Sequence, residues 1–217
     1  FKAYKAVYFV GGKGAMFDFP NNKHIQALVK EFHNTNKVIG AVCHGPAALV
    51  NVNLDNGQAF LKNKKVSGFT NEEELLLIPK AKTIFPFLLQ DKLMAQGAIF
   101  NEGIMYLENI SQDKNLVTGQ NPWSVWALAE VMVQQMGYTP KQRTITAEEN
   151  AVKVLYVYET EGLNSAKALI KECIQKKQNI ARGLFIDHSA IAIITGKLSK
   201  FYHMTSLAAY TKDTEGH

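Results

Sequence analysis

The stretch VIGAVCHGP, residues 38 to 46, decides the fold class and holds the strongest candidate for chemistry. Its first five residues are apolar, as in a buried β-strand, and Gly45 and Pro46 then end the strand and begin a helical turn. In an open α/β sheet, the carboxyl end of a parallel strand lies in the crevice where ligands bind. Cys43 occupies that position, and Gly40 and Gly45 are small enough to allow a tight turn around it. This pattern favours Cys43 as a nucleophile.

Two interpretations of the cysteines stay open. A helix N-terminus after Cys43 would favour the thiolate, because the helix dipole and free backbone N–H groups stabilise negative charge. A cysteine in an apolar strand is also commonly a small buried hydrophobic residue. Cys173 lies in the amphipathic pattern KALIKECIQKK and is interpreted as structural. Two cysteines without metal-ligand spacing predict free thiols, a reducing, cytoplasmic compartment and no metal site.

The segments around this stretch alternate between strand and helix patterns. Residues 3 to 10 (AYKAVYFV) predict a buried strand that ends in a glycine turn, and residues 22 to 36 predict an amphipathic helix. Further strands are predicted at 64 to 69 and 115 to 118, and helices at 72 to 77, 87 to 96 and 123 to 136. Such alternation implies right-handed crossovers and therefore an α/β fold with a parallel sheet.

A polar stretch at residues 139 to 150 predicts the main boundary, with an α/β domain over 1–143 and a C-terminal extension over 144–217. In the extension, residues 152 to 158 predict a strand, 163 to 177 a helix and 185 to 195 another strand. A unit of this size is too small to be stable alone. We therefore expect it to pack on the main domain or to pair across a homodimer.

Composition and charge exclude several classes of protein. Hydrophobic residues make up 47% of the 217, which is enough for a globular core. No apolar run approaches the roughly 18 residues of a membrane-spanning helix, so no membrane contact is predicted. The net charge of +5 is spread without a basic stripe, so nucleic acid is not an expected partner.

Two further motifs could complete a site around Cys43. The glycine turn GGKG, residues 11 to 14, could stabilise an oxyanion through its backbone N–H groups, although a tight turn alone also explains it. In GFTNEEE, residues 68 to 74, Thr70 and Glu73 fit a capping box, and the helix dipole explains a second acid. One glutamate remains that could orient a histidine beside a nucleophile.

Taken together, five stretches resemble the ThiJ/PfpI superfamily, which is related to the class I glutamine amidotransferases. They are YKAVYFVGGKGAMFDFP (4–20), AVCHGPAAL (41–49), VSGFTNEEE (66–74), IFPFLLQDKLMAQGA (84–98) and LVTGQNPWS (116–124). The resemblance covers residues 3 to 138 and looks strongest to the branch of heat-shock chaperones and glutathione-independent glyoxalases. It implies a flavodoxin-like three-layer sandwich with a mainly parallel sheet.

The resemblance also implies roles for single residues. Cys43 would be the nucleophile, His44 its partner and Glu74 the acidic third residue, while the amides of Gly12 and His44 would form an oxyanion pocket. In such relatives the thiol adds to a small dicarbonyl, which implies a glyoxalase III-like conversion of methylglyoxal to lactate or a protein deglycase, without a cofactor. Lys13 stands where the family usually carries histidine, which changes the charge at the pocket mouth.

The family's opening strand, helix and second strand, with a glutamate that contacts the nucleophilic sulfur, would precede Phe1. Either such a segment was cleaved, was lost or belongs to another chain, or the protein is inactive as given. A sheet without these strands exposes an apolar edge, so we expect a missing piece, such as a separate N-terminal fragment, rather than a stand-alone fold. Three functions stay open: an enzyme for small aldehydes, a non-catalytic stress chaperone or redox sensor, and a peptidase or amidase that uses the same residues.

Overall fold

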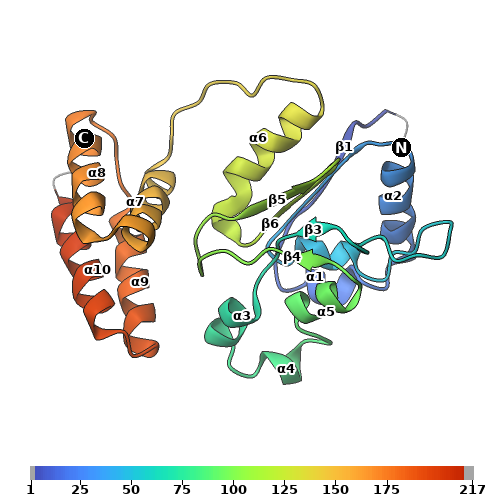
Figure 1. The fold of residues 1–217 in the computed structure, drawn as a ribbon, viewed down its shortest axis with the longest axis horizontal. Helices are drawn as coiled ribbons and strands as arrows, with labels where there is room; N and C mark the ends of the chain where they lie inside the picture. The colour runs from blue at the N-terminus through green and yellow to red at the C-terminus, as the bar shows by residue number, and fades with distance from the viewer. Residues whose placement is uncertain (1–2, 213–217) are drawn as a thin grey trace. The chain divides into compact units, whose positions relative to one another are not determined.

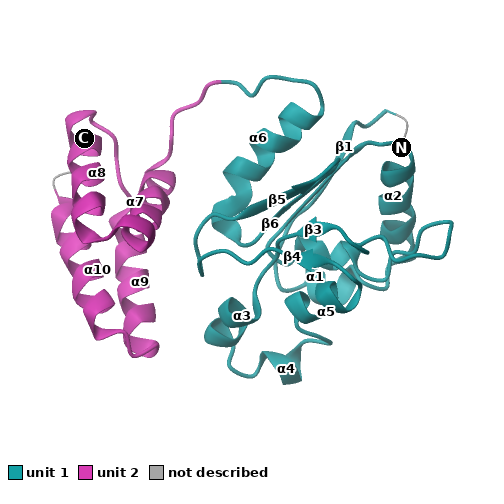
Figure 2. Cartoon of the chain, viewed as in Figure 1, with its two compact units in different colours: residues 1–141 teal, residues 142–217 magenta. Residues whose placement is uncertain are grey.

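The computed structural model describes residues 3 to 212, and the chain divides into two compact units (Figures 1 and 2). The first unit is Phe1–Lys141 and the second is Gln142–His217. The first contains every described strand and all the residues singled out above for chemistry, and the second is helical.

The first unit is built on a four-stranded sheet in the order β1-β2-β6-β5. Its strands are β1 (Ala6–Phe9), β2 (Val38–Val42), β5 (Ile110–Asp113) and β6 (Leu116–Gly119). β1, β2 and β6 run parallel, and β5 is antiparallel to β6. The predicted α/β class with a mainly parallel sheet is therefore confirmed. The carboxyl ends of the three parallel strands lie side by side at one end of the sheet.

Helices cover both faces of this sheet (Figure 1), and every residue of the central strand β2 is therefore buried. α6 (Val125–Gln135) packs on β2 and β6, and α2 (Lys23–Asn34) packs on β2 with Val29 and Phe32 in its buried face. Asn22 caps α2 by accepting hydrogen bonds from the backbone N–H groups at its start. This arrangement is the predicted flavodoxin-like sandwich.

Short elements connect these layers, and several differ from the predicted ranges. They are α1 (Ala15–Asp18), the 3-10 helix η1 (Gly45–Leu49), β3 (Lys65–Val66), α3 (Asn71–Leu77), α4 (Ala81–Ile84), α5 (Leu89–Ala95), β4 (Ile99–Phe100) and the 3-10 helix η2 (Pro122–Ser124). β3 is shorter than the predicted strand and pairs with β4 in a separate two-stranded parallel sheet. The turn after Cys43 is only this short 3-10 helix, which weakens the dipole argument for a thiolate.

The second unit corrects the sequence analysis. It consists of α7 (Ala147–Glu161), α8 (Leu163–Gln175), α9 (Arg182–Ile194) and α10 (Leu198–Tyr210). The strands predicted at 152–158 and 185–195 are wrong, since both ranges fall largely within α7 and α9. α9 buries Leu184, Phe185, His188, Ser189 and Ala192, at helical spacings. A short apolar run does not separate a strand from a buried helix, so the extension is helical rather than α/β.

None of the helices in the described range is long and apolar enough to cross a membrane.

Candidate active site at Cys43

A strained turn at the end of β2 holds Cys43. Its φ is +59°, in the left-handed region that costs a non-glycine residue roughly 1 to 2 kcal/mol. Two backbone hydrogen bonds hold this conformation: Cys43 N–H donates to the carbonyl of Gly119 at 2.9 Å, and Phe69 N–H donates to the carbonyl of Cys43 at 3.0 Å. Backbone strain of this kind is typical of functional sites, including the nucleophile turn of serine hydrolases.

Glycines allow the end of β1 to lie directly against this turn. A Cβ atom added at Gly11 would lie 2.7 Å from the Cβ of Cys43, and one added at Gly45 would lie 2.2 Å from the carbonyl oxygen of Phe9. Both distances are shorter than real contacts of this type, so only glycine fits at either position. The sequence predicts the glycine turn, but no local pattern indicates that Gly11 contacts the candidate nucleophile.

The rest of the glycine turn is more open. Gly12 has a φ of +116°, and a Cβ atom added there would meet no atom within 4 Å. Lys13 is exposed to solvent. The oxyanion role expected for the Gly12 amide and the place of Lys13 at the pocket mouth therefore remain predictions.

The structure brings the three predicted catalytic residues together. The Sγ atom of Cys43 lies 3.4 Å from Nδ1 of His44, and Nε2 of His44 lies 2.5 Å from Oε2 of Glu74. Cys43 is 9% exposed, His44 3% and Glu74 1%. His44 follows β2 in the same turn as Cys43, whereas Glu74 comes from the first turn of α3. The imidazole thus lies between a thiol and a carboxyl group in a buried position.

This arrangement makes His44 a strong base. Burial lowers the pKa of His44, but the hydrogen bonds and charges of Cys43 and Glu74 outweigh that effect and raise it to about 9. At neutral pH the imidazolium is therefore favoured, and its positive charge beside the sulfur stabilises negative charge there. Because the folded pKa exceeds the unfolded value, this pairing stabilises the fold fully below the unfolded pKa of about 6.5 and is lost as pH rises through about 9.

The helix start that carries Glu74 is locally encoded. Thr70 accepts a hydrogen bond from Glu73 N–H, and the Glu73 carboxylate accepts one from Thr70 N–H, so the predicted capping box is confirmed. Of the three acids in this turn, Glu72 is exposed while Glu73 and Glu74 are buried. The capping box therefore accounts for the Oε2 atom of Glu73, and the Glu74 carboxyl group pairs with His44 instead.

Aromatic residues that the sequence analysis did not identify surround the pair. The ring of His44 lies 4.6 Å from Phe69 and 6.2 Å from Phe85, measured between centroids. Burial and then the charges of Glu73, Glu74 and Cys43 raise the pKa of Tyr106 to about 12. Phe69 and Phe85 lie in two of the stretches that carry the family resemblance, but no local pattern indicates that either contacts His44, and Tyr106 lies outside those stretches.

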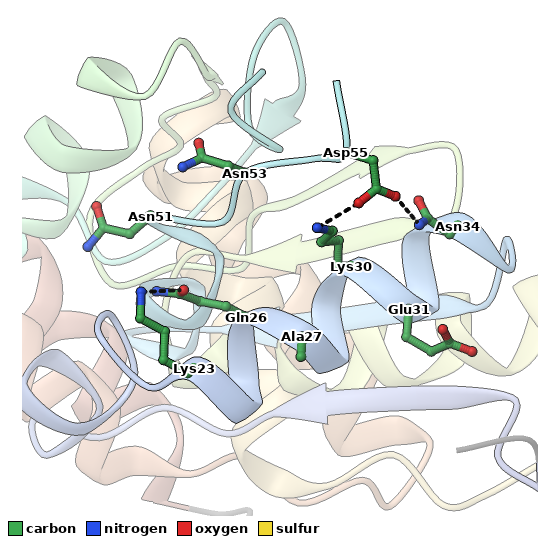
Figure 3. Close-up of a pocket in the computed structure, with 9 residues that line it drawn as sticks. All are labelled: Lys23, Gln26, Ala27, Lys30, Glu31, Asn34, Asn51, Asn53 and Asp55. Carbon is green, nitrogen blue, oxygen red and sulfur yellow. Dashed lines mark hydrogen bonds and ion pairs between the residues drawn. The ribbon is translucent and has the colours of Figure 1, made fainter. Parts of the chain in front are cut away.

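A separate polar groove of about 420 Å³ lies between α2 and the loop after η1 (Figure 3). It is lined by Lys23, Gln26, Ala27, Lys30, Glu31, Asn34, Asn51, Asn53 and Asp55. The Lys30 ammonium lies 2.7 Å from the Asp55 carboxylate, which also accepts a hydrogen bond from Asn34 at 3.0 Å. None of the predicted site residues lines this groove, so we assign it no part in the chemistry at Cys43. Within residues 3 to 212, no group of three or more His, Cys, Asp or Glu could hold a metal ion.

Known proteins resemble the first unit. The chain is 32% identical over 141 residues to glutathione-independent glyoxalase hsp3102 of Schizosaccharomyces pombe, which covers 62% of this chain and 59% of that protein. The X-ray structure of Rapid Encystment Protein 24 kDa of Francisella tularensis has a TM-score of 0.60 and 39% identity, over 62% of this chain and 59% of that one. The structure of glyoxalase III from Candida albicans has a TM-score of 0.58 and 29% identity, over 61% and 57%.

In each of these comparisons, the chain matches less than two thirds of the relative's length. The family model described as the DJ-1/PfpI family matches residues 1–135, the region that holds the sheet and the Cys43 turn. On this match, the chain belongs to the DJ-1/PfpI family.

Proposed function

We propose that this chain is a cysteine-dependent enzyme that converts small reactive dicarbonyls, such as methylglyoxal, to 2-hydroxy acids. One observation carries the proposal: the buried His44, with its pKa raised to about 9, lies between the Cys43 sulfur and the Glu74 carboxyl group. The glyoxalase names of the relatives supply the substrate class. A thiolate is a strong nucleophile towards aldehydes, so the residues suit the chemistry.

The proposed reaction needs no external oxidant or reductant. The Cys43 thiolate attacks the aldehyde carbon, a C–S bond forms, and the carbonyl electrons move to oxygen, which takes a proton from the His44 imidazolium. Neutral His44 then removes the proton from the carbon that carries sulfur, which gives an enediol, and returns it to the neighbouring carbon. The hydroxyl on the sulfur-bearing carbon gives its proton to the neighbouring oxygen, so a thioester C=O forms beside an alcohol. Water cleaves the resulting thioester, which releases the 2-hydroxy acid and restores the thiol.

The neighbouring groups support these steps. Glu74 accepts the N–H of His44 and stabilises the imidazolium, as the third residue of a catalytic set does. The backbone N–H groups of Gly12 and His44 would stabilise the alkoxide, since Gly11 brings the glycine turn against Cys43. Lys13 would add positive charge at the mouth of the site.

We further propose that an additional β-strand completes the sheet beside β1. Within residues 3 to 212, β1 is an edge strand that pairs only with β2, and Tyr4 and Val10 beside it are exposed. A separate N-terminal fragment would supply this strand. The two free cysteines suit a reducing, cytoplasmic compartment, and a homodimer remains part of the proposal.

Replacement of Cys43 by serine tests the proposed enzyme. We expect loss of methylglyoxal and formation of lactate to slow at least about 1,000-fold, as for removal of other catalytic nucleophiles. Cys173→Ser is the matched control, because that thiol is buried in the helical unit and should leave turnover unchanged. The assay includes the N-terminal fragment wherever one co-purifies.

Unchanged turnover in Cys43→Ser would contradict the proposal. If neither protein turns over methylglyoxal, but both suppress aggregation of an unfolded client protein equally, a non-catalytic chaperone is supported instead. Cleavage of peptide amides by the wild type, with methylglyoxal left intact, would favour the peptidase alternative.

A further inference from the structure

Two adjacent buried glutamates on α3 have very different surroundings. Glu73 is 0% exposed, and its Oε1 atom accepts hydrogen bonds from Tyr106 N–H at 2.7 Å, Asn121 Nδ2 at 2.9 Å and Gln120 Nε2 at 3.0 Å. Its Oε2 atom accepts from Thr70 N–H at 3.0 Å. Four uncharged donors therefore hold this carboxylate from three parts of the chain.

The Glu74 carboxyl group has far fewer hydrogen-bond partners than that of Glu73. Its Oε2 atom pairs with His44, and its buried Oε1 atom has no hydrogen-bond partner. The carboxyl group is therefore placed by the backbone of α3 and by His44 alone. Whatever fixes the first turn of α3 also fixes the distance between Glu74 and His44.

The contacts of Glu73 exceed what a helix cap requires. A capping box needs only the reciprocal bonds between Thr70 and Glu73. The three bonds to Oε1 come instead from the loop before β5 and from the residues directly after β6. Burial of a carboxylate without a cation is costly unless every acceptor site is satisfied, so these bonds are needed to keep it there.

The end of β6 links this network to the candidate nucleophile. The carbonyl of Gly119 accepts the N–H of Cys43, and the next two residues, Gln120 and Asn121, bind Glu73. One short segment thus holds the turn with the sulfur and the helix with the carboxyl group. Gln120 and Asn121 are both fully buried, which makes this connection rigid.

We propose that Glu73 is a positioning residue, which ties the first turn of α3 to the end of β6 so that Glu74 stays within hydrogen-bond distance of His44. This inference rests on the roles proposed above for Cys43, His44 and Glu74. The charged and titratable groups near the Glu73 carboxylate are Glu74, the Tyr106 hydroxyl and the Cys43–His44 pair.

The test is the variant Glu73→Gln, which keeps the size of the side chain but places an amide among N–H donors. The readout is the rate at which iodoacetamide alkylates Cys43, measured against pH by peptide mass spectrometry, which separates Cys43 from Cys173. No substrate is needed. Two controls accompany it: Glu72→Gln removes the same charge from an exposed position in the same turn, and Thr70→Val removes the cap hydroxyl alone.

We expect Glu73→Gln to slow alkylation at neutral pH about 10- to 100-fold and to move the rise of the rate to higher pH, as misplacement of a reacting group by about 1 Å does. The reason is that a displaced Glu74 no longer supports the imidazolium beside the sulfur. With methylglyoxal, kcat should fall by a similar factor while KM changes little. Glu72→Gln should keep the wild-type pH profile, and Thr70→Val, which loses only the cap hydroxyl, should shift it much less than Glu73→Gln does.

Glu73→Gln with the wild-type alkylation profile, or Thr70→Val with the same shift as Glu73→Gln, would overturn the inference and leave Glu73 as a helix cap. If Glu73→Gln does not fold by circular dichroism, Gln120→Met removes one of the donors to Glu73 and keeps the charge. It also removes the hydrogen bonds that Gln120 Oε1 accepts from Gly103 N–H and Asn109 Nδ2, so folding of this variant is checked in the same way. A folded Gln120→Met should show a smaller shift of the alkylation rate to higher pH. An unchanged pH profile would count against the proposed connection between Glu73 and the end of β6. Because alkylation requires no turnover, a wild type inactive on methylglyoxal would refute the proposed function without deciding this point.

Discussion

At the residue scale, two glycines show why the same close contact has different consequences. A Cβ atom added at either Gly45 or Gly40 would lie 2.2 Å from another atom. At Gly45 that atom is the backbone carbonyl oxygen of Phe9, which β1 holds in place. At Gly40 it is the sulfur of Met132, at the end of a flexible side chain. Space for a methyl group can therefore be made at Gly40 but not at Gly45.

We accordingly expect Gly45→Ala to lower the free energy of unfolding by about 3 kcal/mol, and Gly40→Ala by less than about 1.5 kcal/mol. Urea denaturation followed by circular dichroism measures both values. Gly45→Ala should also disturb alkylation of Cys43, because the displaced segment adjoins the Cys43 turn. Equal losses of stability in the two variants would show that β1 can move away from η1, contrary to the packing described.

At the scale of elements, β1 and β2 have similar apolar sequences but different positions in the sheet. β2 is central and every one of its residues is buried, whereas β1 lies at the edge with a partly exposed face. An edge strand leaves backbone donors and acceptors open for pairing. The residues that follow β1 contact the Cys43 turn, so a strand that pairs with β1 would also lie close to the candidate site.

Hydrogen exchange followed by mass spectrometry tests this difference. In the isolated chain, we expect the amides of β1 to exchange at least about tenfold faster than those of β2, because they are paired on one side only. Addition of a fragment that supplies the proposed additional strand should slow exchange of the β1 amides selectively. Equal protection of β1 and β2 in the isolated chain would mean that another copy or another strand already covers the edge.

At the scale of the whole molecule, each unit holds a buried histidine, and the pKa values of these two histidines are shifted in opposite directions. Burial and then the charge of Lys200 lower the pKa of His188, in α9 of the second unit, to about 4. Since the folded pKa lies below the unfolded value, the neutral state of His188 supports the fold above about pH 6.5, and this support is lost as pH falls through about 4. His44 in the first unit has the opposite sign, because its pKa is raised.

We therefore expect acid to unfold the second unit before the first. Protonation of His188 should lower the free energy of unfolding of the second unit by up to about 3 kcal/mol. Exchange protection of α9 and α10, compared with that of β2 between roughly pH 7 and 4, measures the order of unfolding. His188→Leu should remove most of this acid sensitivity, while the exposed His24→Gln should not. Acid unfolding of the second unit that is identical in His188→Leu would contradict this assignment.

Local sequence alone determined the parts of this protein that depend on neighbouring residues. The apolar run and sharp turn of residues 38 to 46, the alternation that implies a parallel sheet, and the Thr70–Glu73 capping box all follow from chemistry within a few positions. The meeting of Cys43, His44 and Glu74 was expected from a family resemblance, not from spacing.

Only the tertiary structure decided what depends on long-range contacts. The helical state of the second unit was settled by packing, because its short apolar runs suit a strand or a buried helix equally. Gly11 against Cys43, and Glu73 bound by Gln120 and Asn121 nearly fifty positions away, leave no local signal. Such contacts form only when the sheet brings distant turns together at the carboxyl ends of its parallel strands. For this reason the surroundings of the candidate site could not be predicted from the sequence.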